Sequence, residues 1–197
     1  MPAGPSEVLV VADETSNPAF VASDLLSQAE HGADSQVVLV ANRLEVVEKV
    51  LTEIESQVIK LPRGRTASKA LEHSIFIVQE SLDDQIGLIN EYAPEHLIIN
   101  TKNYAEIADK ITNAGSVFLG EYTPESAGDY ASGTNHTLPT NGWARSYSGV
   151  NLDSFIRKIT FQEISKEGLK KIGQAIENMA ATEELQAHKK AVSMRLK

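Results

Sequence analysis

The chain has 197 residues, of which 42% are hydrophobic and 23% charged, and its formal net charge is -9. This composition is typical of a folded globular protein, with enough chain to bury a sizeable core. The acidic excess argues against nucleic-acid binding, because a phosphate backbone is held mainly by clustered lysine and arginine. We expect the basic cluster at the C-terminus to complement a helix dipole; it comprises Lys189, Lys190, Arg195 and Lys197.

The chain contains no cysteine, which excludes disulfides and thiolate metal sites. Any metal must therefore be held by histidine, carboxylate or amide side chains. No run of about 18 apolar residues occurs, so the sequence predicts no membrane span. The first residues lack the positive and apolar parts of a signal peptide. We expect a cytoplasmic protein, and a strand placed so near the start suits a piece cut at a domain boundary.

Short apolar segments alternate with helical patterns along the first part of the chain. Glu7 begins a β-branched run that predicts a buried strand, and Asn17 followed by Pro18 is typical of a helix start. The expected strands are 7–11, 36–40, 74–78, 96–99 and 116–119, and the expected helices are 18–31, 44–54, 82–92 and 104–111. This alternation predicts a three-layer, Rossmann-like α/β domain with a mainly parallel sheet.

The alternation stops between Gly120 and Val150, in a stretch rich in glycine, serine, threonine, asparagine and proline. A loop of this length inside a compact domain is usually functional or disordered. Further helices are expected over 166–180 and 183–196. The sequence therefore predicts an α/β domain over residues 1–150 and a small, mostly helical appendage over 151–197.

Two pairs of residues have spacings that suit chemistry. Gln28 and His31 lie three residues apart at the end of the first expected helix, as two ligands from one helix would. A histidine at a helix C-terminus is also favoured by the dipole alone. Glu95 and His96 open the fourth expected strand. A carboxylate beside an imidazole is a plausible acid–base pair, although a polar strand edge would look the same.

Residues 125–136 are the most suggestive part of the chain. They concentrate Asp129, Asn135 and His136 among small residues that let the backbone approach a ligand closely. No Gly-x-Gly-x-x-Gly pattern occurs anywhere, so the usual kind of dinucleotide site is not visible. His188, in the last expected helix, would by itself be interpreted as a surface residue.

Taken together, these motifs resemble the histidinol dehydrogenase family. The matching stretches follow the family's order through nearly the whole chain and comprise residues 3–7, 22–32, 34–36, 92–97, 113–118, 122–136 and 187–188. Several long motifs in register leave little room for coincidence. The resemblance is to the C-terminal half of the family's chain. It implies that most contacts to NAD lie outside this sequence, and that the isolated chain is inactive.

The resemblance also implies a zinc site shared across a homodimer. Its ligands would be Gln28, His31, Asp129 and His188, the last from the partner subunit. The substrate would be L-histidinol, which the family oxidises through histidinal to L-histidine with NAD, in the last steps of histidine biosynthesis. The resemblance thus makes the appendage, residues 151–197, a dimerisation tail.

The family's roles carry over to further residues. His96 would take the alcohol proton in the first oxidation, and Glu95 would activate water for the second. Besides His96 and the four zinc ligands, the substrate contacts would be Ser6, His136 and Glu183. Neither a nucleic-acid nor a membrane partner is expected.

Two other functions remain open from the residues alone. The first is a zinc hydrolase in which Glu95 activates a metal-bound water, without NAD. The second is a non-catalytic, zinc-binding dimerisation fragment with an incomplete site.

Overall fold

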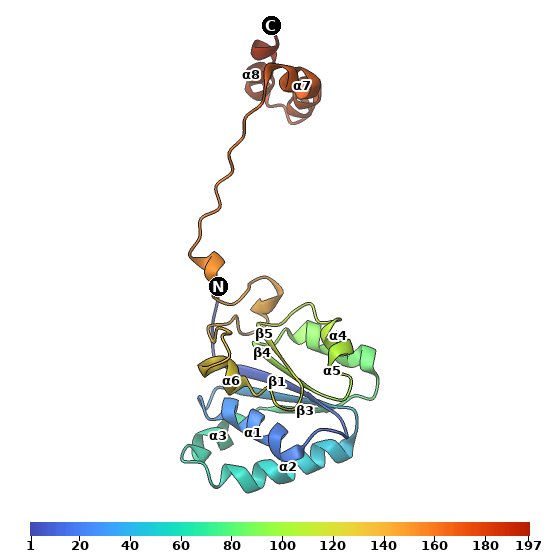
Figure 1. Ribbon diagram of the computed structural model, residues 1–197, viewed down its shortest axis with the longest axis vertical. Coiled ribbons are helices and arrows are strands. Elements are labelled where there is room, and N and C mark those ends of the chain that lie inside the picture. The colour runs from blue at the N-terminus through green and yellow to red at the C-terminus, as the bar shows by residue number, and fades with distance from the viewer. The chain divides into compact units, whose positions relative to one another are not determined.

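The computed structural model describes residues 1–197 and divides into two compact units, Met1–Phe155 and Ile156–Lys197. The first unit contains one five-stranded sheet, whose strands are β1 (Glu7–Ala12), β2 (Gln36–Ala41), β3 (Ile75–Val78), β4 (His96–Asn100) and β5 (Ser116–Leu119). Their order is β3-β2-β1-β4-β5, and every neighbouring pair is parallel (Figure 1). The predicted α/β class and parallel sheet are confirmed.

Helices cover both faces of the sheet and complete the three layers (Figure 1). One face is covered by α1 (Pro18–Ala29), α2 (Leu44–Val58) and α3 (Gly64–Leu71), and the other by α4 (Leu82–Tyr92) and α5 (Tyr104–Ala108). Successive residues of β1 point to opposite faces, so Val8 packs in the first core and Leu9 in the second. Because both faces are covered, β1 and β4 are apolar over most of their length rather than alternating.

The end of α1 positions part of the site. The helix begins as predicted, with the Asn17 side chain accepting a hydrogen bond from the Ala19 N–H at 3.0 Å and with Pro18 in the first turn. It ends at Ala29, earlier than the predicted end at residue 31. His31 therefore lies just beyond the helix, where its N–H donates to the Gln28 carbonyl at 3.2 Å.

The structure contains two helices in the first unit that the sequence pattern does not predict. One is α3, which has only eight residues and buries two small ones, Ala67 and Ala70, so that it has no large apolar side chain on its buried face. The other is α6 (Glu125–Tyr130), which lies in the stretch expected to be irregular. Its buried residues are Glu125 and Gly128, so hydrophobic periodicity has nothing to detect. The short 3-10 helices η1 (Trp143–Arg145) and η2 (Leu152–Ser154) also lie beyond Gly120.

The second unit is a pair of helices, α7 (Lys166–Thr182) and α8 (Gln186–Leu196). They pack closely at Gly173, where an added Cβ would lie 2.6 Å from Leu196 Cδ1. The expectation that the last helix begins at residue 183 is wrong. Glu183 caps the end of α7, and Glu184 turns the chain with a φ of 61° before α8 begins.

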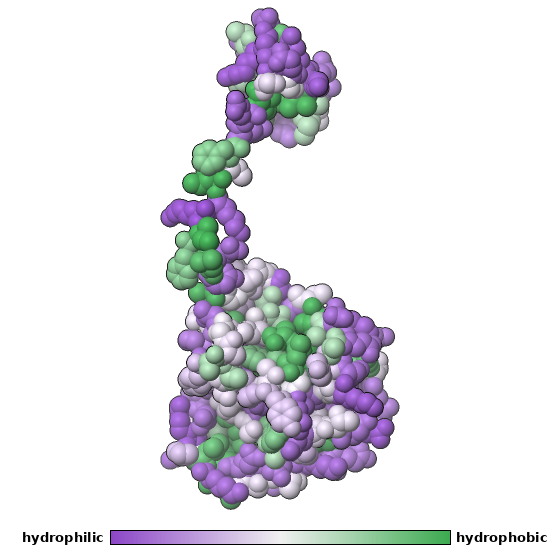
Figure 2. All heavy atoms as spheres, in the orientation of Figure 1, coloured by the Kyte–Doolittle hydropathy of each residue, from purple (hydrophilic) through white to green (hydrophobic).

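Large apolar side chains are exposed along residues 152–164, and Figure 2 shows hydrophobic residues gathered on this segment. Phe161 is 92% exposed. Contiguous exposed apolar surface on a globular protein usually marks an interaction site. None of the helices has the length and apolar character needed to cross a membrane.

Candidate functional site

Five of the predicted site residues gather in the first unit, and they are Gln28, His31, Glu95, His96 and Asp129. They come from the end of α1, the start of β4 and the short helix α6. The cluster therefore lies at the amino ends of the strands. Parallel α/β sheets more often bind ligands at the carboxyl ends of their strands.

His96 lies against its neighbour Glu95, which just precedes β4. Glu95 Oε2 is 3.5 Å from His96 Nδ1, and Nδ1 is also 3.2 Å from the backbone carbonyl oxygen of Glu7. These acceptors favour the tautomer with the proton on Nδ1. Nε2 is then the free acceptor; it is buried, has no hydrogen-bond partner and lies 3.9 Å from Asp129 Oδ1.

Two opposing effects act on the His96 imidazole. Burial lowers the pKa of His96, but the hydrogen bond to Glu95 and the charges of Glu125 and Glu95 together outweigh it and raise the pKa overall. The protonated form is thus stabilised by carboxylates that are themselves buried.

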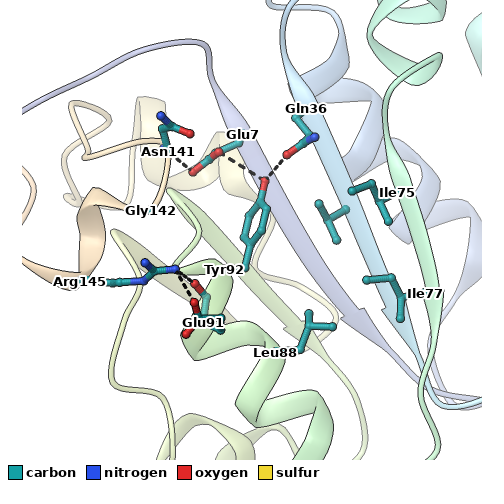
Figure 3. A pocket seen from close by; sticks show the side chains of 11 residues that line it. Glu7, Gln36, Ile75, Ile77, Leu88, Glu91, Tyr92, Asn141, Gly142 and Arg145 are labelled. Carbon is teal, nitrogen blue, oxygen red and sulfur yellow. Dashed lines mark hydrogen bonds and ion pairs between the residues drawn. The ribbon is translucent and has the colours of Figure 1, made fainter.

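Glu7, which sequence analysis places in a strand and in a family-matching stretch without giving it a role, holds Glu95 in position. The Glu7 N–H donates to Glu95 Oε2 at 2.9 Å, and the Glu7 carboxylate accepts from the Glu95 N–H at 3.3 Å. The same carboxylate accepts from the Asn141 N–H at 3.0 Å and from the Tyr92 hydroxyl at 3.3 Å (Figure 3). Burial raises the pKa of Glu7 against the lowering effect of these hydrogen bonds.

Glu7 also lines a cavity of about 490 Å³, which Figure 3 shows between β2, β3 and α4. Its walls are largely apolar and include Ile75, Ile77 and Leu88. Glu7 is the one charged residue in the otherwise apolar strand β1, and this is the sequence signal that could have indicated it as a site residue.

Glu125 is a second residue of the site that sequence analysis does not single out. It is 2% exposed, in the first turn of α6, four residues before Asp129. Hydrogen bonding assigns the Gln28 amide with its nitrogen toward Glu125, 2.7 Å from Oε1 and 2.9 Å from Oε2. Burial raises the pKa of Glu125 to about 7, although the His96 charge opposes this shift. The i,i+4 spacing to Asp129 indicates this residue only once α6 is known to be a helix.

The donor set fits a divalent metal ion. His31, Glu125 and Asp129 each offer a ligand atom, and these atoms lie within 4.8 Å of one another. The Gln28 amide oxygen faces away from Glu125 when the nitrogen faces toward it. Carboxylates crowded in a buried place repel one another, which raises the Glu125 pKa further and which a cation would relieve. Nitrogen and oxygen ligands of this kind are those that zinc accepts.

Asp24 adds another buried carboxylate one helical turn before Gln28. Burial raises the pKa of Asp24 to about 7, and its charge contributes to the raised pKa of Glu125. No pattern in the sequence distinguishes it from an ordinary polar residue of a helix.

The remaining predicted site residues belong to other segments of the chain. Ser6 is half-buried just before β1, and His136 is exposed after α6. Glu183 and His188 belong to the second unit, where both line a hollow of about 280 Å³ with Met179 and Leu185 among its other walls. The turn between α7 and α8 thus places these two side chains near each other. Their roles stay predictions.

The fold and the cluster together define a Rossmann-like α/β protein with a partly buried polar centre whose side chains suit metal binding and proton transfer. A sequence model of the family described as histidinol dehydrogenase matches residues 1–196. The chain belongs to this family.

Individual relatives agree with the family match. The chain is 62% identical over 196 residues to a histidinol dehydrogenase of Bacteroides thetaiotaomicron, covering 100% of this chain and 46% of that protein. It is 53% identical over 198 residues to a histidine biosynthesis trifunctional protein of Neurospora crassa, covering 100% of this chain and 23% of that one.

A solved structure agrees as well. The crystal structure of histidinol dehydrogenase from Elizabethkingia anophelis matches with a TM-score of 0.94 at 62% identity, covering 100% of this chain and 45% of that chain. The chain thus spans less than half the length of these two histidinol dehydrogenases.

Proposed function

We propose that this chain provides the acid–base pair and the zinc ligands of a histidinol dehydrogenase, which oxidises L-histidinol through histidinal to L-histidine with NAD. The observation that carries the proposal is that Gln28, His31, His96 and Asp129 meet at one polar centre in a member of this family. Gln28 and His96 are buried there, whereas His31 is exposed. Since the chain covers 46% of a relative, it would be the C-terminal part, with most NAD contacts outside it.

The zinc would be held by Gln28, His31 and Asp129, with His188 as the fourth protein ligand. A mixed nitrogen and oxygen set is usual in catalytic zinc sites, which keep a position open for substrate. When bound, the zinc would orient L-histidinol by accepting its nitrogens as ligands.

His96 is the base for the first oxidation in this proposal. Its Nδ1 proton is directed to the Glu7 carbonyl oxygen and the Glu95 carboxylate, which leaves the buried Nε2 to accept the proton of the alcohol. The alcohol carbon gives its hydride to NAD, and the aldehyde forms. The carboxylates of Glu95 and Glu125 then stabilise the imidazolium.

Glu95 is the base for the second oxidation. Water adds to the aldehyde carbon, with its proton taken by Glu95, and the hydrate then gives a hydride to a second NAD. The hydrogen bond from the Glu7 N–H keeps the Glu95 carboxylate oriented, because both groups are buried and neither can turn to solvent.

The proposal includes a homodimer whose sites are shared. The second unit buries very little by itself: α7 buries only Gly173 and Ala180, and α8 buries no residue. Two helices with so small a core need further surface to pack on. The exposed apolar side chains of residues 152–164 support docking on a second copy. Glu183 and His188 would then serve the partner's site.

A second candidate function is a non-catalytic, zinc-binding dimerisation fragment. It is favoured by the coverage of 46%, because the cofactor contacts of the relatives would then be missing. Adding NAD and L-histidinol to the zinc-loaded chain distinguishes the two. The fragment function predicts no reduced nicotinamide, whereas a competent enzyme forms it.

The metal assignment is tested by the zinc content of the purified chain. We expect about one zinc per chain. His31→Ala and Asp129→Ala should lose tight zinc binding, because removing one of about four ligands greatly lowers the zinc affinity of such a site. His73→Ala is the matched control, since His73 is exposed and its imidazole bonds the Ala33 carbonyl oxygen at 2.9 Å, away from the proposed ligands. Stoichiometric zinc in both ligand variants would refute the assignment.

A further inference from the structure

The position of Glu125 raises the question of why a further acid is buried in a site already rich in carboxylates. Its two oxygens lie 2.7 Å and 2.9 Å from the Gln28 amide nitrogen. Oε1 also lies 3.8 Å from His96 Nδ1. The Glu125 carboxylate thus faces Gln28 and His96, and one of its oxygens also lies within 4.8 Å of the ligand atoms of His31 and Asp129.

The Gln28 side chain needs such an acceptor. It is 0% exposed, so water cannot satisfy its amide, and the nitrogen and oxygen ends of an amide have nearly the same shape. With the amide reversed, its oxygen would face the ionised Glu125 carboxylate at hydrogen-bond distance with no proton between them. In its ionised form the carboxylate therefore permits one orientation only.

We propose that Glu125 is a positioning residue that holds the Gln28 amide nitrogen and so turns the amide oxygen toward the metal. This inference rests on the proposed zinc site. An amide nitrogen that carries two protons has no lone pair to offer a cation, so a reversed Gln28 is not a ligand. Partners that orient metal ligands in this way commonly change metal affinity about 10- to 100-fold when they are removed.

The first test needs no metal. In the metal-free chain, NMR should show the Nε2 protons of Gln28 exchanging slowly with water. Glu125→Met, which keeps the length but removes both acceptor oxygens, should make them exchange fast. Glu125→Gln keeps one acceptor oxygen and should be intermediate. Fast exchange in the starting chain, or no change in Glu125→Met, overturns the inference.

The control is Glu121→Gln, which removes a nearby exposed carboxylate and should leave these protons unchanged. Thermal unfolding checks that each variant is folded. If Glu125→Met does not fold, the comparison of Glu125→Gln with the starting chain still decides.

The second test is a double-mutant cycle read by zinc affinity, measured by competition with a chelator. Glu125→Met should weaken zinc binding about 10- to 100-fold in the starting chain. In the Gln28→Ala background it should weaken binding by less than about threefold, because a residue that acts through Gln28 has nothing left to position. Equal losses in both backgrounds would mean that Glu125 acts on the metal directly, which overturns the inference.

The two proposals fail separately. A starting chain that binds no zinc contradicts the proposed function, and the amide-exchange measurement then decides alone whether Glu125 orients Gln28. Normal zinc binding with equal losses in both backgrounds leaves the proposed function intact and removes the positioning role.

Discussion

At the scale of single residues, the site is distinguished by its buried carboxylates. Glu7, Asp24, Glu95 and Glu125 are each less than a tenth exposed. A buried ionised carboxylate costs free energy unless hydrogen bonds or opposite charges compensate it. Glu7 and Glu95 accept hydrogen bonds from each other's backbone, and Glu125 accepts from Gln28. For Asp24, burial alone accounts for a pKa of about 7.

Asp24 makes the stability of the metal-free chain depend on pH. Its pKa is 3.8 when unperturbed and about 7 in the folded chain, so the folded state binds the proton more tightly. The stability contributed by protonated Asp24 is therefore complete below about pH 4 and is lost as the pH rises toward about 7. Asp24→Asn cannot ionise, so relative to the starting chain it should gain stability between about pH 4 and pH 8, on the order of a few kcal/mol.

Denaturant unfolding of the starting chain and of Asp24→Asn, at about pH 4 and at about pH 8, measures this difference in stability. Asp34→Asn is the control, because Asp34 is exposed and should change stability equally at both pH values. An Asp24→Asn difference that does not grow with pH would show that Asp24 ionises freely in the folded chain.

The acid–base roles also belong to single residues. In an enzyme of full family length, His96→Asn should slow both oxidations, by about 100- to 10,000-fold if the imidazole is a general base. Glu95→Gln should slow histidinal oxidation much more than histidinol oxidation, because the amide cannot accept the proton of water. Rates of reduced nicotinamide formation from each substrate give the comparison, with zinc content as the control. Equal loss from both substrates in Glu95→Gln would contradict the separation of roles.

At the scale of elements, three short segments form the site: the end of α1, the start of β4, and α6. Of these, α6 has the weakest local reason to be a helix, since its only two buried residues are Glu125 and Gly128. It is held by a close approach to β5. A Cβ on Gly128 would lie 2.6 Å from Phe118 Cε1 and 2.6 Å from Thr134 Oγ1.

Gly128→Ala should therefore displace α6 and move both of its carboxylates. We expect a loss of about 1–3 kcal/mol in unfolding free energy, as for other overpacked sites, together with weaker zinc binding. Ser126→Ala is the control, because Ser126 is exposed on the same helix. Unfolding curves and chelator competition measure the two effects. A Gly128→Ala chain as stable as the starting chain, with unchanged zinc affinity, would show that this contact does not position α6.

At the scale of the whole molecule, the proposed dimer depends on the second unit. Its helices bury little within the unit, and large apolar side chains such as Met179 and Met194 are exposed. If the second unit docks on a second copy, its His188 would supply the fourth zinc ligand of that copy, so the zinc site would be complete only in the dimer.

Mixing two defective chains tests this connection. Alone, His31→Ala and His188→Ala should both bind zinc weakly. In a heterodimer with shared sites, one of the two sites regains His31 from one chain and His188 from the other, so about one zinc per heterodimer should bind tightly. Zinc content after chelator challenge measures it, with heterodimers confirmed by mass. Heterodimers that recover no zinc would show that His188 does not act across the interface.

The sequence by itself determined the sheet, because the apolar strands and the helices between them carry patterns set by their own burial. It also indicated five clustered site residues, since Gln28 with His31 and Glu95 with His96 are local pairs and Asp129 lies in a family motif. The tertiary structure alone decided the rest. The buried carboxylates of Glu7 and Glu125 make their contacts with groups distant in the sequence, namely the Glu95 backbone and the Gln28 amide. Hydrophobic periodicity records which side chains are buried, whereas the orientation of a buried polar group depends on partners that only folding brings within hydrogen-bond distance.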